Sequence, residues 1–148
     1  MGIRKEIYYE GQAAIELEMA AGAVSSEYPF DLQELEDNTL ILIEPIFKGI
    51  VSDLERGVGV ESISSKFHNT IAKIILNMCL KIRKKSGLDR VALSGGVFQN
   101  SLLLENAYVL LDKKNFKVFT QHRVPPNDGG IALGQVVIAN EHIKRGLG

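Results

Sequence analysis

The segment Arg90 to Leu104, which reads RVALSGGVFQNSLLL, constrains the fold most. It predicts a strand over Arg90 to Leu93, a glycine turn and then a helix. Backbone N–H groups and the positive end of a helix dipole meet at such a turn and can hold an anion. The spacing fits neither the GxxxxGK[ST] loop nor GxGxxG. Gly95 and Gly96 therefore leave two interpretations open, a phosphate-binding corner or a tight turn without a ligand, because glycine supplies a positive φ in either.

Strand and helix alternate through the second half of the chain. We predict a helix over Gln99 to Lys114, a strand over Phe116 to Thr120 and a last helix from about Gly129 to Lys144. This alternation indicates an α/β fold with parallel strands, whose ligand sites lie at the carboxyl ends of the strands. We therefore expect the loops Ser94 to Phe98 and Gln121 to Gly130 at the same end of a short parallel sheet.

The first half of the chain predicts helices and little sheet. The expected elements are a short amphipathic helix over Gln12 to Ala23 after Gly11, a surface excursion of little chemical interest over Val24 to Asn38, a strand-like run over Leu40 to Ile43, a helix over Pro45 to Glu55 and a long helix from about Ser62 to Lys85. We predict a single domain, with residues 1–38 as first helix and excursion and residues 39–148 as the core lobe.

The composition excludes several classes of protein. The chain has 148 residues with 17 basic and 18 acidic side chains, so no basic face for nucleic acid is expected. The longest charge-free stretch after Asp128 has 12 residues, too few to span a bilayer. Cys79 is the only cysteine, which excludes an internal disulfide and favours the cytoplasm. We expect Cys79 to behave as a small buried hydrophobe.

Polar residues near the predicted turns are candidates for ligand contacts. Asn100 is expected either to cap its helix or to aim its amide at a phosphate. Asp128 has two interpretations of similar weight, a helix cap or a carboxylate ligand for a divalent cation. The small residues Gly130 and Gly134 predict close packing of the last helix. The three histidines form no HxxxH or HExxH pair, and His68 is expected to be a packed or hydrogen-bonded residue.

Two motifs together resemble a known family. LSGGVFQN at Leu93 to Asn100 and VPPNDGGIALGQ at Val124 to Gln135 are similar to the carboxyl-terminal end of HypF-type carbamoyltransferases, the maturation factors of [NiFe] hydrogenases. YEGQAAIELE at Tyr9 to Glu18 and SKFHNTIA at Ser65 to Ala72 also resemble that family, so the resemblance covers nearly the whole chain.

The resemblance implies a fold, a reaction and a set of residues. The fold would be a helix-rich lobe of the actin-like ATPase superfamily (ASKHA), of the Kae1-like branch, with a short parallel sheet. The reaction would use ATP and carbamoyl phosphate to form carbamoyl adenylate, then transfer the carbamoyl group to the carboxyl-terminal cysteine of HypE. By motif, nucleotide contacts would come from Gly11, Gln12, Glu16, Gly95, Gly96, Asn100 and Gly129, and Asp128 would bind a divalent metal.

The chain also departs from the family pattern. The acylphosphatase-like domain, the zinc-binding CxxC motifs, the YrdC-like domain and the histidine pair that completes the metal site are not in this sequence. We therefore expect a carboxyl-terminal fragment that is inactive alone and that works with the missing amino-terminal portion and with HypE. Exposed lobe surface is expected to favour self-association. The alternatives are a related Kae1- or NodU-type carbamoyltransferase and a non-catalytic interaction module.

Overall fold

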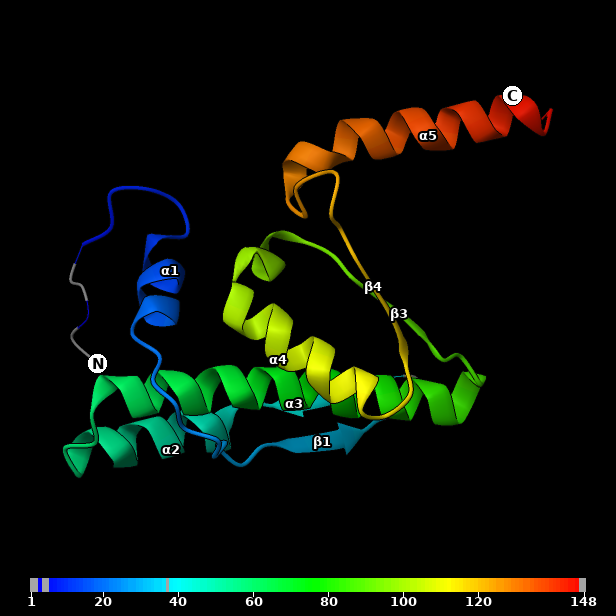
Figure 1. Cartoon of the computed structure of the whole chain (residues 1–148). Coiled ribbons are helices and arrows are strands. Elements are labelled where there is room, and N and C mark those ends of the chain that lie inside the picture. Colours follow the sequence, from blue (N-terminus) through cyan, green and yellow to red (C-terminus); the bar gives the residue numbers. More distant parts are fainter. Residues whose placement is uncertain (1–2, 4–5, 37, 147–148) are drawn as a thin grey trace.

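Helices alternate with short strands in the computed structural model, which describes residues 3, 6–36 and 38–146 (Figure 1). The elements are α1 (Gln12–Met19), β1 (Asp31–Glu34), β2 (Thr39–Leu42), α2 (Glu44–Glu55), α3 (Val60–Ser86), β3 (Arg90–Leu93), a 3₁₀ turn (Gly96–Gln99), α4 (Ser101–Asp112), β4 (Lys117–Thr120), a second 3₁₀ turn (Asp128–Gly130) and α5 (Ile131–Lys144). The predicted helices and strands of the second half are confirmed, and the two glycine-containing turns begin as 3₁₀ rather than α-helix.

The predicted parallel sheet is present and has two strands. β3 pairs with β4 in parallel, with Val91 opposite Val118 and Leu93 opposite Thr120. α4 connects the two strands, as a parallel pair requires. The carboxyl ends of both strands therefore lie at one edge, from which the two predicted loops leave.

The main core lies between α3, α4 and this sheet. Its fully buried members are apolar and come from all three parts of the fold: Ala72, Leu76, Leu93, Leu103, Ala107, Leu111 and Phe116. Cys79 packs against this cluster half-buried, and burial raises the pKa of its thiol. Cys79 therefore packs as a small apolar side chain, as expected, but it is half-buried rather than buried.

α3 is 27 residues long, about 40 Å at 1.5 Å per residue, and ends as its sequence predicts. Gly87 follows it with φ +74° and donates its N–H to the Arg83 carbonyl at 2.8 Å. The basic side chains of Arg83, Lys84 and Lys85 lie in its last turn, where cations complement the dipole. The Arg83 guanidinium also lies 4.0 Å from the ring centre of Phe116.

The predicted surface excursion over Val24 to Asn38 is largely exposed, apart from Asp37, which lies outside the described residues, but it is bound along α3 and contains β1, a strand that the sequence did not predict. Polar side chains of α3 bind the chain from Leu17 to Tyr28 along the helix. The bonds run from Ser65 Oγ to the Gly22 carbonyl (2.7 Å), from Asn69 Nδ2 to the carbonyls of Val24 (2.7 Å) and Ser26 (3.0 Å), and from the Tyr28 N–H to Thr70 Oγ1 (2.8 Å). β1 then pairs with β2 as an antiparallel hairpin.

A buried charge joins the same segment to α2. Asp53 is 1% exposed and accepts hydrogen bonds from the Tyr28 hydroxyl (2.8 Å), the Lys66 ammonium (2.7 Å) and the Arg56 guanidinium. The Lys66 bond, aided by those from Tyr28 and Arg56, holds the pKa of the Asp53 carboxyl below its usual value. Burial raises the pKa of Tyr28, and Asp53 adds to the rise. The cluster therefore favours an ionised aspartate and a neutral tyrosine.

Two helices differ from their predicted packing. α1 ends at Met19 instead of Ala23, and its expected apolar side is exposed, since Met19 is 79% exposed while Gln12 is buried. α5 extends away from the other elements (Figure 1) and has no buried residue among those described. A Cβ added at Gly134 would meet no atom within 4 Å, so close packing is not found there. No helix in the described part of the chain is long and apolar enough to cross a membrane.

Candidate functional site

The turn after β3 contains two glycines, Gly95 and Gly96. The backbone conformation requires glycine only at Gly95. Gly95 has φ +107° and ψ 160°, a conformation that side chains with a Cβ rarely adopt. Gly96 has no positive φ, and a Cβ added there would meet only the Cβ of Asn127, at 3.9 Å. Backbone geometry therefore accounts for Gly95, whereas neither conformation nor crowding accounts for Gly96.

The two predicted loops are joined by one main-chain and one side-chain hydrogen bond. The Gly95 N–H donates to the Pro126 carbonyl at 2.9 Å, and Gln121 Nε2 donates to Ser94 Oγ at 3.1 Å. The expectation that both loops lie at the same end of the sheet is confirmed. We call the pair of loops, Ser94–Phe98 with Gln121–Gly130, the double-loop site.

Two adjacent donors remain available in this site. Within the described residues, the N–H groups of Gly96 and Val97 have no hydrogen-bond partner, and both residues are exposed. Neighbouring N–H groups at the start of a turn form a concave anion-binding geometry. The donors that an anion would meet thus belong to the 3₁₀ turn.

The start of α4 is occupied by a residue that the sequence did not reveal. The Glu18 carboxylate accepts from the N–H groups of Ser101 (2.7 Å) and Leu102 (3.2 Å), and Asn100 Oδ1 accepts from the Leu103 N–H (2.8 Å). A negative charge is therefore already bound at the positive end of this helix. Of the two interpretations of Asn100, the structure shows the cap. Glu18 lies 83 residues from Ser101, so no local pattern indicates the contact.

The candidate residues of α1 form their own network beside α4. Gly11 precedes the helix with φ +78°. Gln12 is 4% exposed; its Oε1 accepts from the Tyr8 N–H at 2.8 Å, and its Nε2 donates to Glu16 Oε1 at 2.9 Å. α1 lies next to the start of α4 (Figure 1), and Glu18 links the two helices. Gln12 and Glu16 are thereby held together on a helix whose end is anchored through Glu18 to the start of α4.

The 3₁₀ turn Asp128–Gly130 is capped by Asn127, the residue before the predicted cap Asp128. Asn127 Oδ1 accepts from the Gly129 N–H at 3.1 Å, so the cap is Asn127 rather than Asp128. Asp128 is exposed, and its carboxylate forms no hydrogen bond or ion pair with any described residue. Gly130 is required sterically, because a Cβ there would lie 2.9 Å from the Pro125 carbonyl oxygen. The loop thus presents a carboxylate that has no partner among the described residues.

One carboxylate does not make a metal site. Among the residues that the structure describes, no group of three or more His, Cys, Asp or Glu side chains could hold a metal ion. Asp128 offers a hard oxygen ligand that suits a divalent cation, yet the remaining ligands must come from elsewhere.

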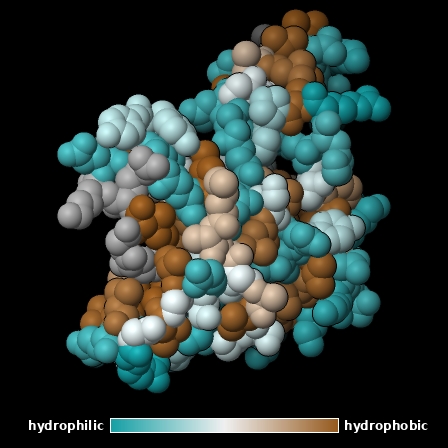
Figure 2. Space-filling model, turned by 60° about the vertical axis from the view of Figure 1, so that its left-hand side comes forward, coloured by the Kyte–Doolittle hydropathy of each residue, from teal (hydrophilic) through white to brown (hydrophobic). Residues whose placement is uncertain are grey.

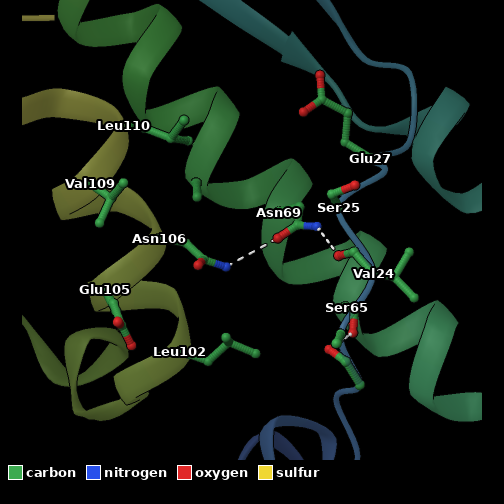
Figure 3. A pocket seen from close by; sticks show the side chains of 13 residues that line it. Val24, Ser25, Glu27, Ser65, Asn69, Leu102, Glu105, Asn106, Val109 and Leu110 are labelled. Atoms are coloured by element: carbon green, nitrogen blue, oxygen red, sulfur yellow. Dashed lines mark hydrogen bonds between the residues drawn. The ribbon is translucent and has the colours of Figure 1, made fainter. Parts of the chain in front are cut away.

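A separate cavity of about 470 Å³ lies over α3, between α4 and residues 22–27 (Figure 3). Asn106 Nδ2 donates to Asn69 Oδ1 at 3.1 Å across it, and Asn69 Nδ2 is bound to the main chain of Val24 and Ser26. The amides here hold the fold together. The cavity contains none of the predicted site residues.

Comparison with known proteins agrees with the resemblance of the motifs. The family described as "Carbamoyltransferase, Kae1-like Domain, second subdomain" matches residues 1–135. The carbamoyltransferase HypF of Synechocystis sp. is 33% identical over 139 residues, which are 93% of this chain and 17% of that protein. The chain therefore spans less than a fifth of the length of this relative.

Two solved structures share the fold. A crystal structure of full-length HypF in its phosphate- and nucleotide-bound form matches with a TM-score of 0.90 and 42% identity, over 95% of this chain and 18% of that one. The HypF of T. kodakarensis matches with a TM-score of 0.78 and 25% identity, over 97% of this chain and 18% of that one.

Proposed function

The chain belongs to the HypF carbamoyltransferase family, and from this premise we propose that it forms one wall of the nucleotide and metal site of an ATP-dependent carbamoyltransferase. The observation that carries the proposal is the hydrogen bond from the Gly95 N–H to the Pro126 carbonyl at 2.9 Å. It holds two free N–H donors and the free carboxylate of Asp128 on adjoining loops, a pairing that suits phosphate groups with a bridging cation.

The phosphates of ATP would lie on the turn after β3. The N–H groups of Gly96 and Val97 supply the donors. The fold does not require glycine at position 96, but the absence of a Cβ there leaves room for a phosphate to approach the main chain. Asn100 borders this turn. The Gly129 N–H is bound to Asn127, and a Cβ at Gly129 would lie 3.1 Å from Asn127 Oδ1 and 3.2 Å from Pro125 Cγ, so Gly129 would contribute by keeping the loop compact next to Asp128.

The ribose and base of ATP would lie towards α1, near Gly11, Gln12 and Glu16. Gln12 holds Glu16 Oε1 by its amide, which fixes the direction of that carboxylate. A carboxylate is a suitable acceptor for the hydroxyl groups of a ribose. The link through Glu18 would keep this wall at a constant distance from the phosphate turn.

Asp128 would be one ligand of a divalent cation that neutralises phosphate charge. Its loop is stiffened by two prolines, and its carboxylate has no competing partner among the described residues. The other ligands would come from an amino-terminal portion such as the relatives carry.

The reaction proposed for the whole protein uses ATP and carbamoyl phosphate to form carbamoyl adenylate, with release of phosphate and diphosphate. It then transfers the carbamoyl group to the carboxyl-terminal cysteine thiol of HypE in the cytoplasm, with release of AMP. This chain would take part by binding and orienting the nucleotide. We propose that it is inactive alone, because a wall with two N–H donors and one carboxylate encloses no substrate.

The test combines the chain with the separately produced amino-terminal portion and titrates ATP with Mg²⁺ by calorimetry. Combination should produce an ATP-binding event that neither piece shows alone, beyond any binding by the YrdC-like domain of the amino-terminal portion. Asp128→Ala should weaken that binding by at least about tenfold, which corresponds to about 1.4 kcal/mol. Asp112→Ala is the matched control, because Asp112 is also an exposed aspartate but lies at the far end of α4. Unchanged binding in Asp128→Ala would contradict the metal assignment.

A further inference from the structure

His68 connects the helices that carry the candidate nucleotide residues. It lies in α3, is 3% exposed, and both ring nitrogens have partners. Nδ1 lies 2.9 Å from the Ser64 carbonyl oxygen, and Nε2 lies 2.9 Å from Asn100 Nδ2. The expectation of a hydrogen-bonded histidine is confirmed. One of its partners, Asn100, directly follows the 3₁₀ turn after β3.

The partners determine which nitrogen carries the proton. Asn100 Oδ1 accepts from the Leu103 N–H at 2.8 Å, so the amide nitrogen of Asn100 is the group that faces His68. An amide nitrogen donates only, so His68 Nε2 must accept. The ring proton then resides on Nδ1 and is donated to the Ser64 carbonyl.

We propose that His68 is a positioning residue for the nucleotide site, one that fixes the Asn100 amide so that one of its hydrogens stays bound to the imidazole and the other is available to a ligand. Rotating this amide by 180° would place nitrogen against the Leu103 N–H and oxygen against Nε2, which loses both bonds. The identity of the ligand rests on the function proposed above.

The same contacts extend to α1. Ser64 Oγ donates to the Leu17 carbonyl, and the Ser64 main chain accepts from His68. One turn of α3 thus touches α1 through Ser64 and the start of α4 through His68. Side chains held from both ends lose little freedom when a ligand binds, which is how a preorganised site gains affinity.

Two substitutions separate positioning from packing. In His68→Gln the terminal amide reaches the place of Nε2 and offers an acceptor to Asn100, whereas in His68→Asn the shorter amide reaches only the place of Nδ1. ATP affinity is measured with the chain combined with its amino-terminal portion. We expect an affinity within about threefold of the parent for His68→Gln. For His68→Asn and Asn100→Ala we expect a loss of about tenfold or more, which corresponds to about 1.4 kcal/mol. Equal losses in His68→Gln and His68→Asn, or none in either, would overturn the proposal.

A spectroscopic measurement decides the positioning without a nucleotide. In the chain alone, ¹⁵N NMR of labelled histidine should show His68 as a neutral ring protonated at Nδ1, with a scalar coupling between Asn100 Nδ2–H and Nε2. A ring protonated at Nε2 would refute the proposal. Should the parent assembly fail to bind ATP while this signature is present, the proposed function fails and the positioning of Asn100 stands.

Discussion

At Gly95 the backbone has φ +107° and ψ 160°, a region that alanine occupies only under strain. We predict that Gly95→Ala lowers the free energy of unfolding by about 1–3 kcal/mol, the usual cost of a residue in such a conformation. The substitution meets no atom within 4 Å, so steric overlap would not add to the loss. Chemical denaturation of the chain measures it.

Gly96→Ala is the matched control for that measurement. Its backbone is not in the positive-φ region, and its new methyl group would approach only Asn127, at 3.9 Å. Stability should be unchanged, while ATP affinity of the combined protein should fall if phosphate approaches this position. A Gly96→Ala variant as unstable as Gly95→Ala would contradict the conformational explanation.

Single residues of the site differ in how far their sequence predicts them. Gly95 and Asn100 were identified because a strand, a glycine turn and a cap follow one another locally. Asn127 was missed as the cap because Asn and Asp are equally good caps, and only geometry separates two adjacent candidates. Glu18 was missed because its contact with Ser101 is made across the fold.

The junction of α2, α3 and Tyr28 contains one buried ionised group, Asp53. The hydrogen bond from Lys66 is the main reason why the pKa of Asp53 is lower in the folded chain than in the unfolded chain. The contribution of Asp53 to stability is therefore complete above the ordinary carboxyl pKa of about 3.9. It is lost as the pH falls below that value towards the folded pKa. Asp53→Asn removes the charge but keeps the shape. We predict a loss of about 1–3 kcal/mol at neutral pH and a smaller dependence of stability on pH below about 4. Denaturant titrations from pH 7 to 3 measure both.

Glu44→Gln provides the comparison for Asp53. The hydrogen bond from Lys48 lowers the pKa of Glu44 as well, but both side chains of this pair are 75% exposed. Exposed i,i+4 pairs contribute little, so the variant should match the parent at neutral pH. A Glu44→Gln variant that loses as much stability as Asp53→Asn would show that burial is not the deciding factor.

The elements followed from the sequence where hydrophobic spacing is regular and failed where it is not. α2, α3, β3, α4 and β4 carry clear patterns or terminal signals, and their predicted bounds agree with the structure to within a few residues. β1 (DLQE) shows no alternation of apolar and polar residues, and only its partner β2 defines it as a strand. The burial of Tyr28 likewise depends on Asp53 and Thr70, which lie far along the chain.

The whole molecule leaves a large apolar surface uncovered. Ile131, Leu133, Val136, Val137, Ile138 and Ile143 of α5 are all more than half exposed, and Figure 2 shows hydrophobic side chains gathered on this helix at the top of the view. Patches of this kind mark contacts with another part of a protein or with another chain. We propose that the amino-terminal portion covers α5 and that a second copy does so in its absence.

We predict that the chain alone self-associates with rising concentration and that Leu133→Glu with Val137→Glu reduces this association. Each buried side chain of this size contributes about 1.5–3 kcal/mol, so the dissociation constant should rise by tenfold or more. Sedimentation velocity over a range of concentrations measures the change. Gln135→Glu adds charge at a polar position of the same helix and should have little effect. A parent chain that stays monomeric throughout would contradict the predicted self-association, and a chain that also fails to bind the amino-terminal portion would contradict the proposal.

α3 performs two tasks along one axis. Residues 64–70 carry the polar groups that hold residues 17–28 and Asn100, and the residues that follow, such as Ala72 and Leu76, pack into the main core. Consecutive residues of a helix are about 100° apart around the axis, as 3.6 residues per turn require. Insertion or deletion of one residue between the two sets would turn the histidine away from its amide while the core stayed in place. The number of residues between these two sets is therefore a constraint on the chain, and substitution experiments alone do not reveal it.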